Sequence, residues 1–305
     1  MIKVFGHKSP DTDATLSAII WAWYLTTVRH TPAVPYLLGE PNTEAAFLLD
    51  HWGFAKPEII ADVSADDKVA IVDTNNPAEL PPSINDAQII SIIDHHMLVG
   101  GLSTKTPINI VIRPLACTAT VMHDMMGDDL ERAPRAIKGA MLSCILSDTL
   151  EFRSPTTTDH DRAVAEKLAA DLGVNIPELA SAMFAAKSDV SRFSDAELLR
   201  MDSKEYNVAG KELRVSVLET TSPKIVLDRK ASLMASMSGV AAEDGADQVL
   251  LFVVDILREE ATLLVPNDLV KQMAEASFGV KVTGDTVVLP GVMSRKKQII
   301  PMLKL

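Results

Sequence analysis

Four short segments of this sequence combine carboxylates with imidazoles or hydroxyls in settings that favour metal binding. They are GHKSPDTDA at residues 6–14, VDT at 72–74, IIDHH at 92–96 and LSDT at 146–149. Carboxylate oxygens and imidazole nitrogens are common protein ligands of divalent metals, and a bound divalent metal can supply hydroxide at neutral pH. The four segments therefore predict a metal-dependent hydrolytic reaction.

A parallel β-sheet would bring three of these segments together. Short β-branched runs alternate with longer helical patterns in the first half of the chain, which predicts an α/β fold with a doubly wound, mainly parallel sheet. The expected strands are residues 3–5, 34–38, 69–72, 89–93 and 108–112. The expected helices are residues 13–28, 43–52, 118–126, 134–146, 159–172 and 177–186. Ligands of such sheets bind outside the carboxyl ends of the strands.

The second part of the chain predicts a smaller, mixed α/β domain. The polar stretch KSDVSRFSD has no hydrophobic period and separates the two parts. We expect a catalytic domain at 1–187, a linker at 188–195 and a substrate-binding domain at 196–305. In the latter we expect a hairpin (206–208 and 213–218), helices at 224–242 and 269–278, and strands at 249–255, 262–265, 281–282 and 286–289.

The acids of the first segment, taken alone, also admit an ordinary structural explanation. Asp13 can cap the helix that follows it, and Asp11 can close the Ser-Pro turn. Asp148 is less easily explained, because a carboxylate at a helix C-terminus opposes the helix dipole and needs a compensating cation.

The segments taken together favour a metal centre. The side chains expected to converge are His7, Asp11, Asp13, Asp73, His95 and Asp148. Their carboxylates would repel one another strongly without cations. Two divalent ions that share one carboxylate, about 3.5–4 Å apart, would relieve this repulsion. The mixture of imidazole and carboxylate favours Mn, Co or Fe over a site that binds Mg alone.

With SRKKQIIP at 294–301 and the fourth segment extended to 161, the segments resemble those of family II inorganic pyrophosphatases. These are manganese-dependent enzymes of the DHH phosphoesterase superfamily. The resemblance spans the chain, although Thr74 stands where many members have a histidine. It implies that a metal-activated hydroxide at a dinuclear site hydrolyses pyrophosphate to two phosphates, while the C-terminal domain closes over the substrate.

The resemblance also implies a role for each candidate residue. One metal would be held by His7, Asp11 and Asp73, and the other by Asp13, Asp73, His95 and Asp148. Asp73 would thus be the bridge, and His96 would face the substrate and act in catalysis. The phosphate ligands would be Lys204, Arg295 and Lys296, although the basic run 295–297 alone suggests only a solvated surface. The implied cofactors are two Mn2+ or Co2+ ions per subunit, with additional Mg2+ arriving with pyrophosphate, and the implied assembly is a homodimer.

The composition limits the possible partners and compartment. The formal net charge of −12 opposes binding to nucleic acid. The most apolar stretch, residues 14–28, is shorter than the roughly 20 residues of a membrane span, and the N-terminus lacks a signal-peptide pattern. We therefore expect a cytoplasmic enzyme that binds neither membrane nor nucleic acid. Cys117 and Cys144 lie in apolar stretches and predict buried free thiols.

Two other functions compete with this interpretation. Other DHH phosphoesterases cut single-stranded nucleic acid or cyclic dinucleotides with the same metal edge. Those acting on nucleic acid typically carry a glycine-rich segment with a histidine in the second domain, whereas the glycines there are isolated. Aromatic residues for base stacking are only 5% of the chain. A catalytically silent metal or nucleotide sensor is disfavoured, because all six ligand positions are filled.

Overall fold

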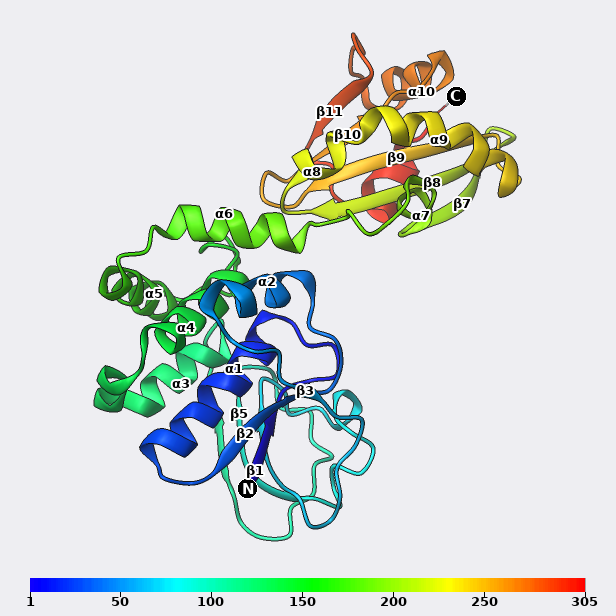
Figure 1. The fold of residues 1–305 in the computed structure, drawn as a ribbon. Helices are drawn as coiled ribbons and strands as arrows, with labels where there is room; N and C mark the ends of the chain where they lie inside the picture. Colours follow the sequence, from blue (N-terminus) through cyan, green and yellow to red (C-terminus); the bar gives the residue numbers. More distant parts are fainter. Residues whose placement is uncertain (305) are drawn as a thin grey trace. The chain divides into compact units, whose positions relative to one another are not determined.

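A six-stranded parallel sheet organises the first half of the chain in the computed structural model, which describes residues 1–304 (Figure 1). The strand order is β3-β2-β1-β4-β5-β6, and every pair of neighbours is parallel. The strands are β1 Ile2–Phe5, β2 Ala33–Leu37, β3 Glu58–Ile59, β4 Lys68–Val72, β5 Gln88–Asp94 and β6 Asn109–Ile112. The predicted α/β fold with a parallel sheet is confirmed.

Helices pack on one face of this sheet, and the connection between β4 and β5 packs in a separate core. The helical elements are α1 Thr12–Trp23, η1 Tyr24–Val28, α2 Thr43–Trp52, η2 Pro77–Glu79, α3 Thr118–Met126, η3 Gly127–Arg132, α4 Arg135–Asp148, α5 Asp159–Leu172 and α6 Ile176–Lys187. Helices α1 to α5 supply the main core with one face of the sheet, while Leu80 and Ile84, from the β4–β5 connection, pack with β4 and β5 in a separate core. The strand order reverses between β1 and β4, so their carboxyl ends frame a ligand-binding crevice.

A close contact between α2 and α4 fixes the helix that carries Asp148. Gly139 of α4 lies against the ring of Trp52, since a Cβ added at this glycine would meet three ring carbons at 2.5 Å. The indole Nε1 of Trp52 also donates a hydrogen bond to Ser143 Oγ at 2.9 Å. The absent side chain thus lets the two helices pack ring to backbone.

A five-stranded mixed sheet organises the second half of the chain, in the order β11-β10-β9-β8-β7. Only β8 and β9 are parallel neighbours. Its strands are β7 Ser203–Val208, β8 Lys211–Thr220, β9 Gln248–Asp255, β10 Glu260–Leu264 and β11 Thr286–Pro290. Its helices are α7 Asp195–Arg200, α8 Pro223–Leu227, α9 Lys230–Glu243, α10 Asp268–Phe278, η4 Arg295–Ile299 and α11 Ile300–Met302.

Strand β9 is buried along its whole length and supplies alternate residues to two cores. Helix α10 and η4 complete one core, and α7, α8 and α9 complete the other. The two halves of the chain form separate compact units, Met1–Ala186 and Lys187–Leu305. No helix within residues 1–304 is long and apolar enough to cross a membrane.

Three predicted elements differ from the structure. The expected helix at 13–28 changes to a wider π-helical turn after Trp23, and the expected helix at 224–242 breaks at Asp228. At this break the Arg229 amide bonds to the Val226 carbonyl, and its guanidinium binds Asp195 and the Val190 carbonyl. The expected strand at 281–282 is wrong.

At this last position the backbone has a different partner. The Val282 amide donates to the Glu275 carboxylate at 3.1 Å rather than to a neighbouring strand. Helix α7, by contrast, was missed within and after the expected linker, although Ser194 and Glu197 form a capping box that the sequence S-x-x-E signals.

Candidate metal centre

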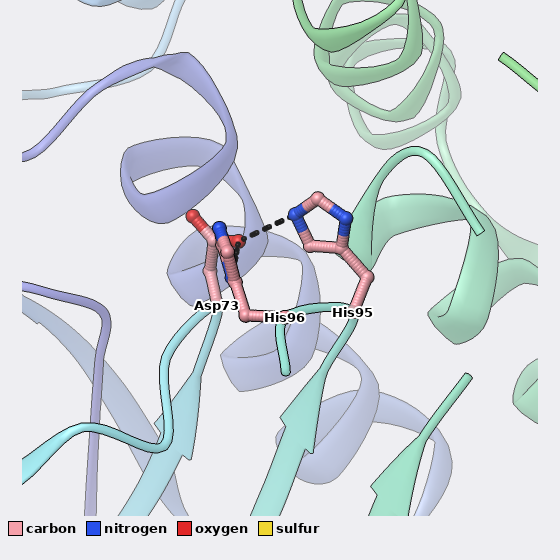
Figure 2. Close-up of side chains that lie close together, drawn as sticks. All are labelled: Asp73, His95 and His96. Carbon is pink, nitrogen blue, oxygen red and sulfur yellow. Dashed lines mark ion pairs between the residues drawn. The ribbon is translucent and has the colours of Figure 1, made fainter. Parts of the chain in front are cut away.

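The candidate centre lies at the carboxyl ends of β1, β4 and β5, where the strand order reverses. His7 follows β1, Asp73 follows β4, and His95 and His96 follow β5. Figure 2 shows the Asp73 carboxylate at the end of β4 with the two imidazoles of the next strand beside it. Side chains from three strand ends therefore converge, as the sequence predicted.

Asp73 occupies the middle of the centre. It is 1% exposed, and its backbone adopts a left-handed conformation (φ 57°) while its amide bonds to the Ile93 carbonyl. Its Oδ2 lies 3.5 Å from His7 Nε2, and its Oδ1 lies 3.4 Å from His95 Nε2. The two oxygens of one carboxylate thus face two different imidazoles, an arrangement that suits a carboxylate shared between two cations.

His7, Asp11 and Asp73 form one group of possible ligands, with ligand atoms all within 4.8 Å of one another. His7 Nε2 lies 3.6 Å from Asp11 Oδ1. The same Asp11 oxygen accepts the Ala14 amide at 3.0 Å, so Asp11, not Asp13, caps α1. Asp11 can therefore cap the helix and still bind a metal, because a carboxylate has several acceptor positions.

Asp13 and Asp148 form a second group, together with Cys117. Asp13 is 1% exposed and accepts hydrogen bonds from Ser17 Oγ at 2.8 Å and the Thr118 amide at 2.7 Å. Asp148 is the last residue of α4, two residues beyond the predicted end of that helix. Cys117 is a buried free thiol, as predicted, but no pattern in the sequence indicates that it adjoins two candidate ligands.

The adjacent residues His95 and His96 are oriented by different acceptors. The Leu115 carbonyl lies 3.1 Å from His95 Nδ1 and accepts the proton of that nitrogen, so Nε2 is the ring nitrogen that faces Asp73. His96 Nδ1 lies 2.8 Å from Asp94 Oδ1, and its side chain is 53% exposed. His95 thus faces the buried carboxylate through Nε2, while His96 is held at the solvent-facing edge.

Asp94 is a residue whose role the sequence did not reveal. It is fully buried, and its Oδ1 also accepts the amides of His95 and His96 at 2.7 and 3.0 Å. Its Oδ2 accepts Asn75 Nδ2 at 2.6 Å. Asp94 therefore fixes the turn on which both histidines sit. An acid directly before two histidines was the available signal.

The electrostatics of the centre follow from burying carboxylates together. Burial and the charge of Asp73 raise the pKa of Asp13 to about 6, and burial and Asp13 raise the pKa of Asp148 well above its usual range. Burial raises the pKa of Asp73, but hydrogen bonds from His7 and His95 outweigh burial and bring it below its usual range.

The histidines respond in the opposite direction. Burial lowers the pKa of His7, but Asp11 and Asp73 outweigh it and bring the pKa to about 10. Asp73 and Asp13 likewise outweigh burial at His95 and bring its pKa to about 9. Protonated imidazoles thus supply positive charge to the centre, and bound divalent cations would replace those protons.

A cavity of about 580 Å³ opens beside His7 and His96. It is also lined by Lys8, Thr74 and Glu79. Thr74 Oγ1 donates to Glu79 Oε2 at 2.8 Å, so the residue that departs from the family pattern supports the cavity wall. The cavity has room for a small polyanion next to the candidate ligands.

The predicted phosphate ligands lie in the second unit. Lys204 is exposed on β7, and Lys296 is exposed in η4. Arg295 is bound to Asp202, through the backbone carbonyl at 2.6 Å and the carboxylate at 2.8 Å. Since Asp202 directly precedes β7, this pair brings the 295–297 run and Lys204 to the same region of the second unit.

Known proteins resemble this chain along its whole length. Residues 1–148 match the model of the DHH family N-terminal domain, and residues 181–305 match that of the DHHA2 domain. The probable manganese-dependent inorganic pyrophosphatase of Deinococcus radiodurans is 41% identical to this chain, and the match covers 100% of this chain and 98% of the relative's length.

Two further relatives agree. The manganese-dependent inorganic pyrophosphatase of Bacillus subtilis is 34% identical over 99% of this chain and 97% of its own. A solved Methanococcus jannaschii structure, assigned to the family II inorganic pyrophosphatases, is 34% identical with a TM-score of 0.62 over 99% of this chain and 97% of its own. This chain belongs to the family II, manganese-dependent inorganic pyrophosphatases of the DHH superfamily.

Proposed function

We propose that this chain hydrolyses inorganic pyrophosphate to two phosphates at a pair of Mn2+ ions bridged by Asp73. The observation that carries this proposal is the position of the Asp73 carboxylate, whose two oxygens face His7 and His95 separately at 3.5 and 3.4 Å. The names of its relatives as manganese-dependent pyrophosphatases support the substrate and the metal.

The donor sets fit two such ions. His7, Asp11 and Asp73 offer one imidazole and two carboxylates to the first ion. The second ion would be held by Asp13, Asp73, His95 and Asp148. Such mixed sets suit Mn2+ or Co2+, while additional Mg2+ would accompany the substrate phosphates. Two divalent cations would lower the pKa of a water held between them, so that hydroxide is available near neutral pH.

His96 would act on the substrate. Its Nδ1 is engaged by Asp94, which leaves Nε2 free to donate a hydrogen bond or proton to the bridging or leaving oxygen of pyrophosphate. Its half-exposed position beside the 580 Å³ cavity supports this role, because a substrate atom can reach the ring there.

We also propose that the second unit binds the substrate phosphates through Lys204, Arg295 and Lys296 and closes over the first. The candidate metal ligands all lie before residue 149 and these cations all lie after residue 203, so one substrate would need both units. Arg295 would give up or share its bond to Asp202 on binding phosphate. As the family resemblance implies, the working enzyme would be a cytoplasmic homodimer.

The proposed function is tested by phosphate release after chelation. Pyrophosphate should be hydrolysed far faster than tripolyphosphate or a dinucleotide, because the candidate phosphate ligands are only three. Mn2+ or Co2+ should restore more activity than Mg2+, which binds imidazole poorly. A comparable rate on the dinucleotide would favour the rival phosphodiesterase function, and full recovery with Mg2+ alone would contradict the metal assignment.

Asp73→Asn and His96→Gln should separate metal binding from substrate chemistry. Asp73→Asn removes the charge of the bridge and should therefore release metal from both sites. The rate should fall by more than about 100-fold, which is the largest loss usual for a residue that only hydrogen-bonds to a metal ligand. His96→Gln should lower the rate by about 10²–10⁴-fold with metal content unchanged.

Elemental analysis and initial rates measure both effects, and Asp66→Asn, at an exposed acid, is the matched control. Two tightly bound metals in Asp73→Asn would show that the bridge is elsewhere. Loss of metal in His96→Gln would make His96 a ligand.

Asp148→Asn should stabilise the metal-free protein at neutral pH. An acid with a raised pKa is bound to a proton more tightly in the folded state, so folded stability falls as pH rises through the window between the ordinary and raised values. For Asp13 this window runs from 3.8 to about 6. At pH values above this window, Asp148→Asn removes the repulsion between the carboxylates of Asp148 and Asp13.

The midpoint temperature with chelator should rise by roughly 2–4 °C for each kcal/mol relieved in a unit of this size. The gain should shrink near pH 4, where the wild-type acid is protonated, and reverse when Mn2+ is added, because a ligand is lost. Thermal unfolding at both pH values measures this. An Asp148→Asn variant less stable than wild type in chelator would show that the ionised acid is not destabilising.

Closure is tested with Lys296→Ala, which should raise KM and lower kcat while the metal content stays at the wild-type level. Small-angle scattering with a saturating non-hydrolysable analogue should show a smaller radius of gyration. An unchanged radius would argue against a closing motion.

A further inference from the structure

A second cluster of two imidazoles and one carboxylate shares no residue with the proposed catalytic centre. It consists of His123, Asp124 and His160. His123 and Asp124 lie in the last turn of α3, and His160 is the second residue of α5, a helix that packs against α3 (Figure 1). Two elements separated by more than thirty residues thus bring these three side chains together.

Both imidazoles approach the same carboxylate oxygen. His160 Nε2 lies 2.8 Å from Asp124 Oδ1, and His123 Nδ1 lies 3.3 Å from it. All three ligand atoms are within 4.8 Å of one another. Metal–ligand distances of about 2.0–2.2 Å place the ligands of a tetrahedral ion roughly 3.3–3.6 Å apart. The His123 contact already has this spacing, and the His160 contact must open by roughly half an ångström.

The burial of the three side chains suits such an adjustment. His123 and Asp124 are 18% and 23% exposed and packed, whereas His160 is 46% exposed and can turn. The exposed side also leaves room for a water to complete the coordination. The cluster is therefore a partly preformed site with one movable ligand.

Arg113 holds the carboxylate in the orientation that such a site needs. Its guanidinium donates to Asp124 Oδ2 at 2.8 Å, which turns Oδ1 toward the two rings. In known metal sites, hydrogen bonds of this kind hold the metal-binding side chains in their orientation. The positive charge of Arg113 opposes a cation, but its side chain is 42% exposed, so solvent screens much of that repulsion.

We propose that His123, Asp124 and His160 form a peripheral site for a divalent cation that accepts imidazole and carboxylate, with Zn2+ as the best match. Two imidazoles and one carboxylate, with water in the fourth position, form a common tetrahedral zinc set. The partial exposure and the nearby guanidinium make the site weaker than the buried centre. Its occupancy should accordingly change with the concentration of the free metal ion.

Metal counting tests this proposal on the untagged, Mn2+-loaded enzyme. After equilibrium dialysis against micromolar Zn2+, the sum of bound manganese and zinc should be one ion per chain higher in the wild type than in His160→Gln. Counting the sum makes exchange of metals at the catalytic centre irrelevant. The difference also does not depend on how many ions that centre holds, so the proposed function can fail without affecting this result.

The matched control is His51→Gln, at an exposed histidine in the last turn of α2 outside any cluster of candidate ligands. It should retain the additional ion, whereas Asp124→Asn should lose it, and pyrophosphate hydrolysis with Mn2+ should be unchanged in all three. Equal metal sums in wild type and His160→Gln would overturn the proposal. So would retention of the ion by Asp124→Asn, or its loss in His51→Gln.

Discussion

Four carboxylates gathered at the point where the sheet order reverses form the constraint on which the rest of the first unit depends. Asp13 and Asp73 are each 1% exposed, so water cannot screen their charges. The structure balances them with protons: imidazole pKa values rise to about 10 and about 9 at His7 and His95, and Asp13 holds its proton up to about pH 6. Divalent cations would balance the same charges in place of these protons.

The surrounding backbone limits the same repulsion. Thr118 begins α3 and directs two donors at the centre, its amide to Asp13 at 2.7 Å and its hydroxyl to Asp73 at 3.0 Å, so the positive end of the α3 dipole faces the carboxylates. Glu44, buried under the centre, accepts Thr12 Oγ1 at 2.9 Å and Ser147 Oγ at 2.7 Å. It thereby ties the start of α1, which carries Asp13, to the end of α4, which carries Asp148.

The sequence predicted the parts of this arrangement that depend on period and strand order, including the parallel sheet, most helices and the convergence of strand-end residues. It did not predict features that depend on three-dimensional packing. Cys117 adjoins Asp13 and Asp148 only because α3 and α4 meet beneath the sheet edge. The role of Asp94 appears only in the turn geometry, where its carboxylate accepts the backbone amides of His95 and His96. The sequence likewise did not predict the helix break at Asp228, next to which Arg229 contacts the distant residue Asp195.

The two clusters of imidazole and carboxylate differ in what balances their negative charge, and this difference sets how each should behave. At the central cluster the carboxylates outnumber the imidazoles and much of their charge is buried, so a divalent cation would relieve a large repulsion. At the peripheral cluster Arg113 already offsets the charge of Asp124, so a cation would gain coordination by the two rings and this carboxylate but little relief of repulsion. A metal ion should therefore bind more tightly at the central cluster, where unbalanced negative charge is buried, than at the peripheral cluster. The donor set alone decides which metal is accepted.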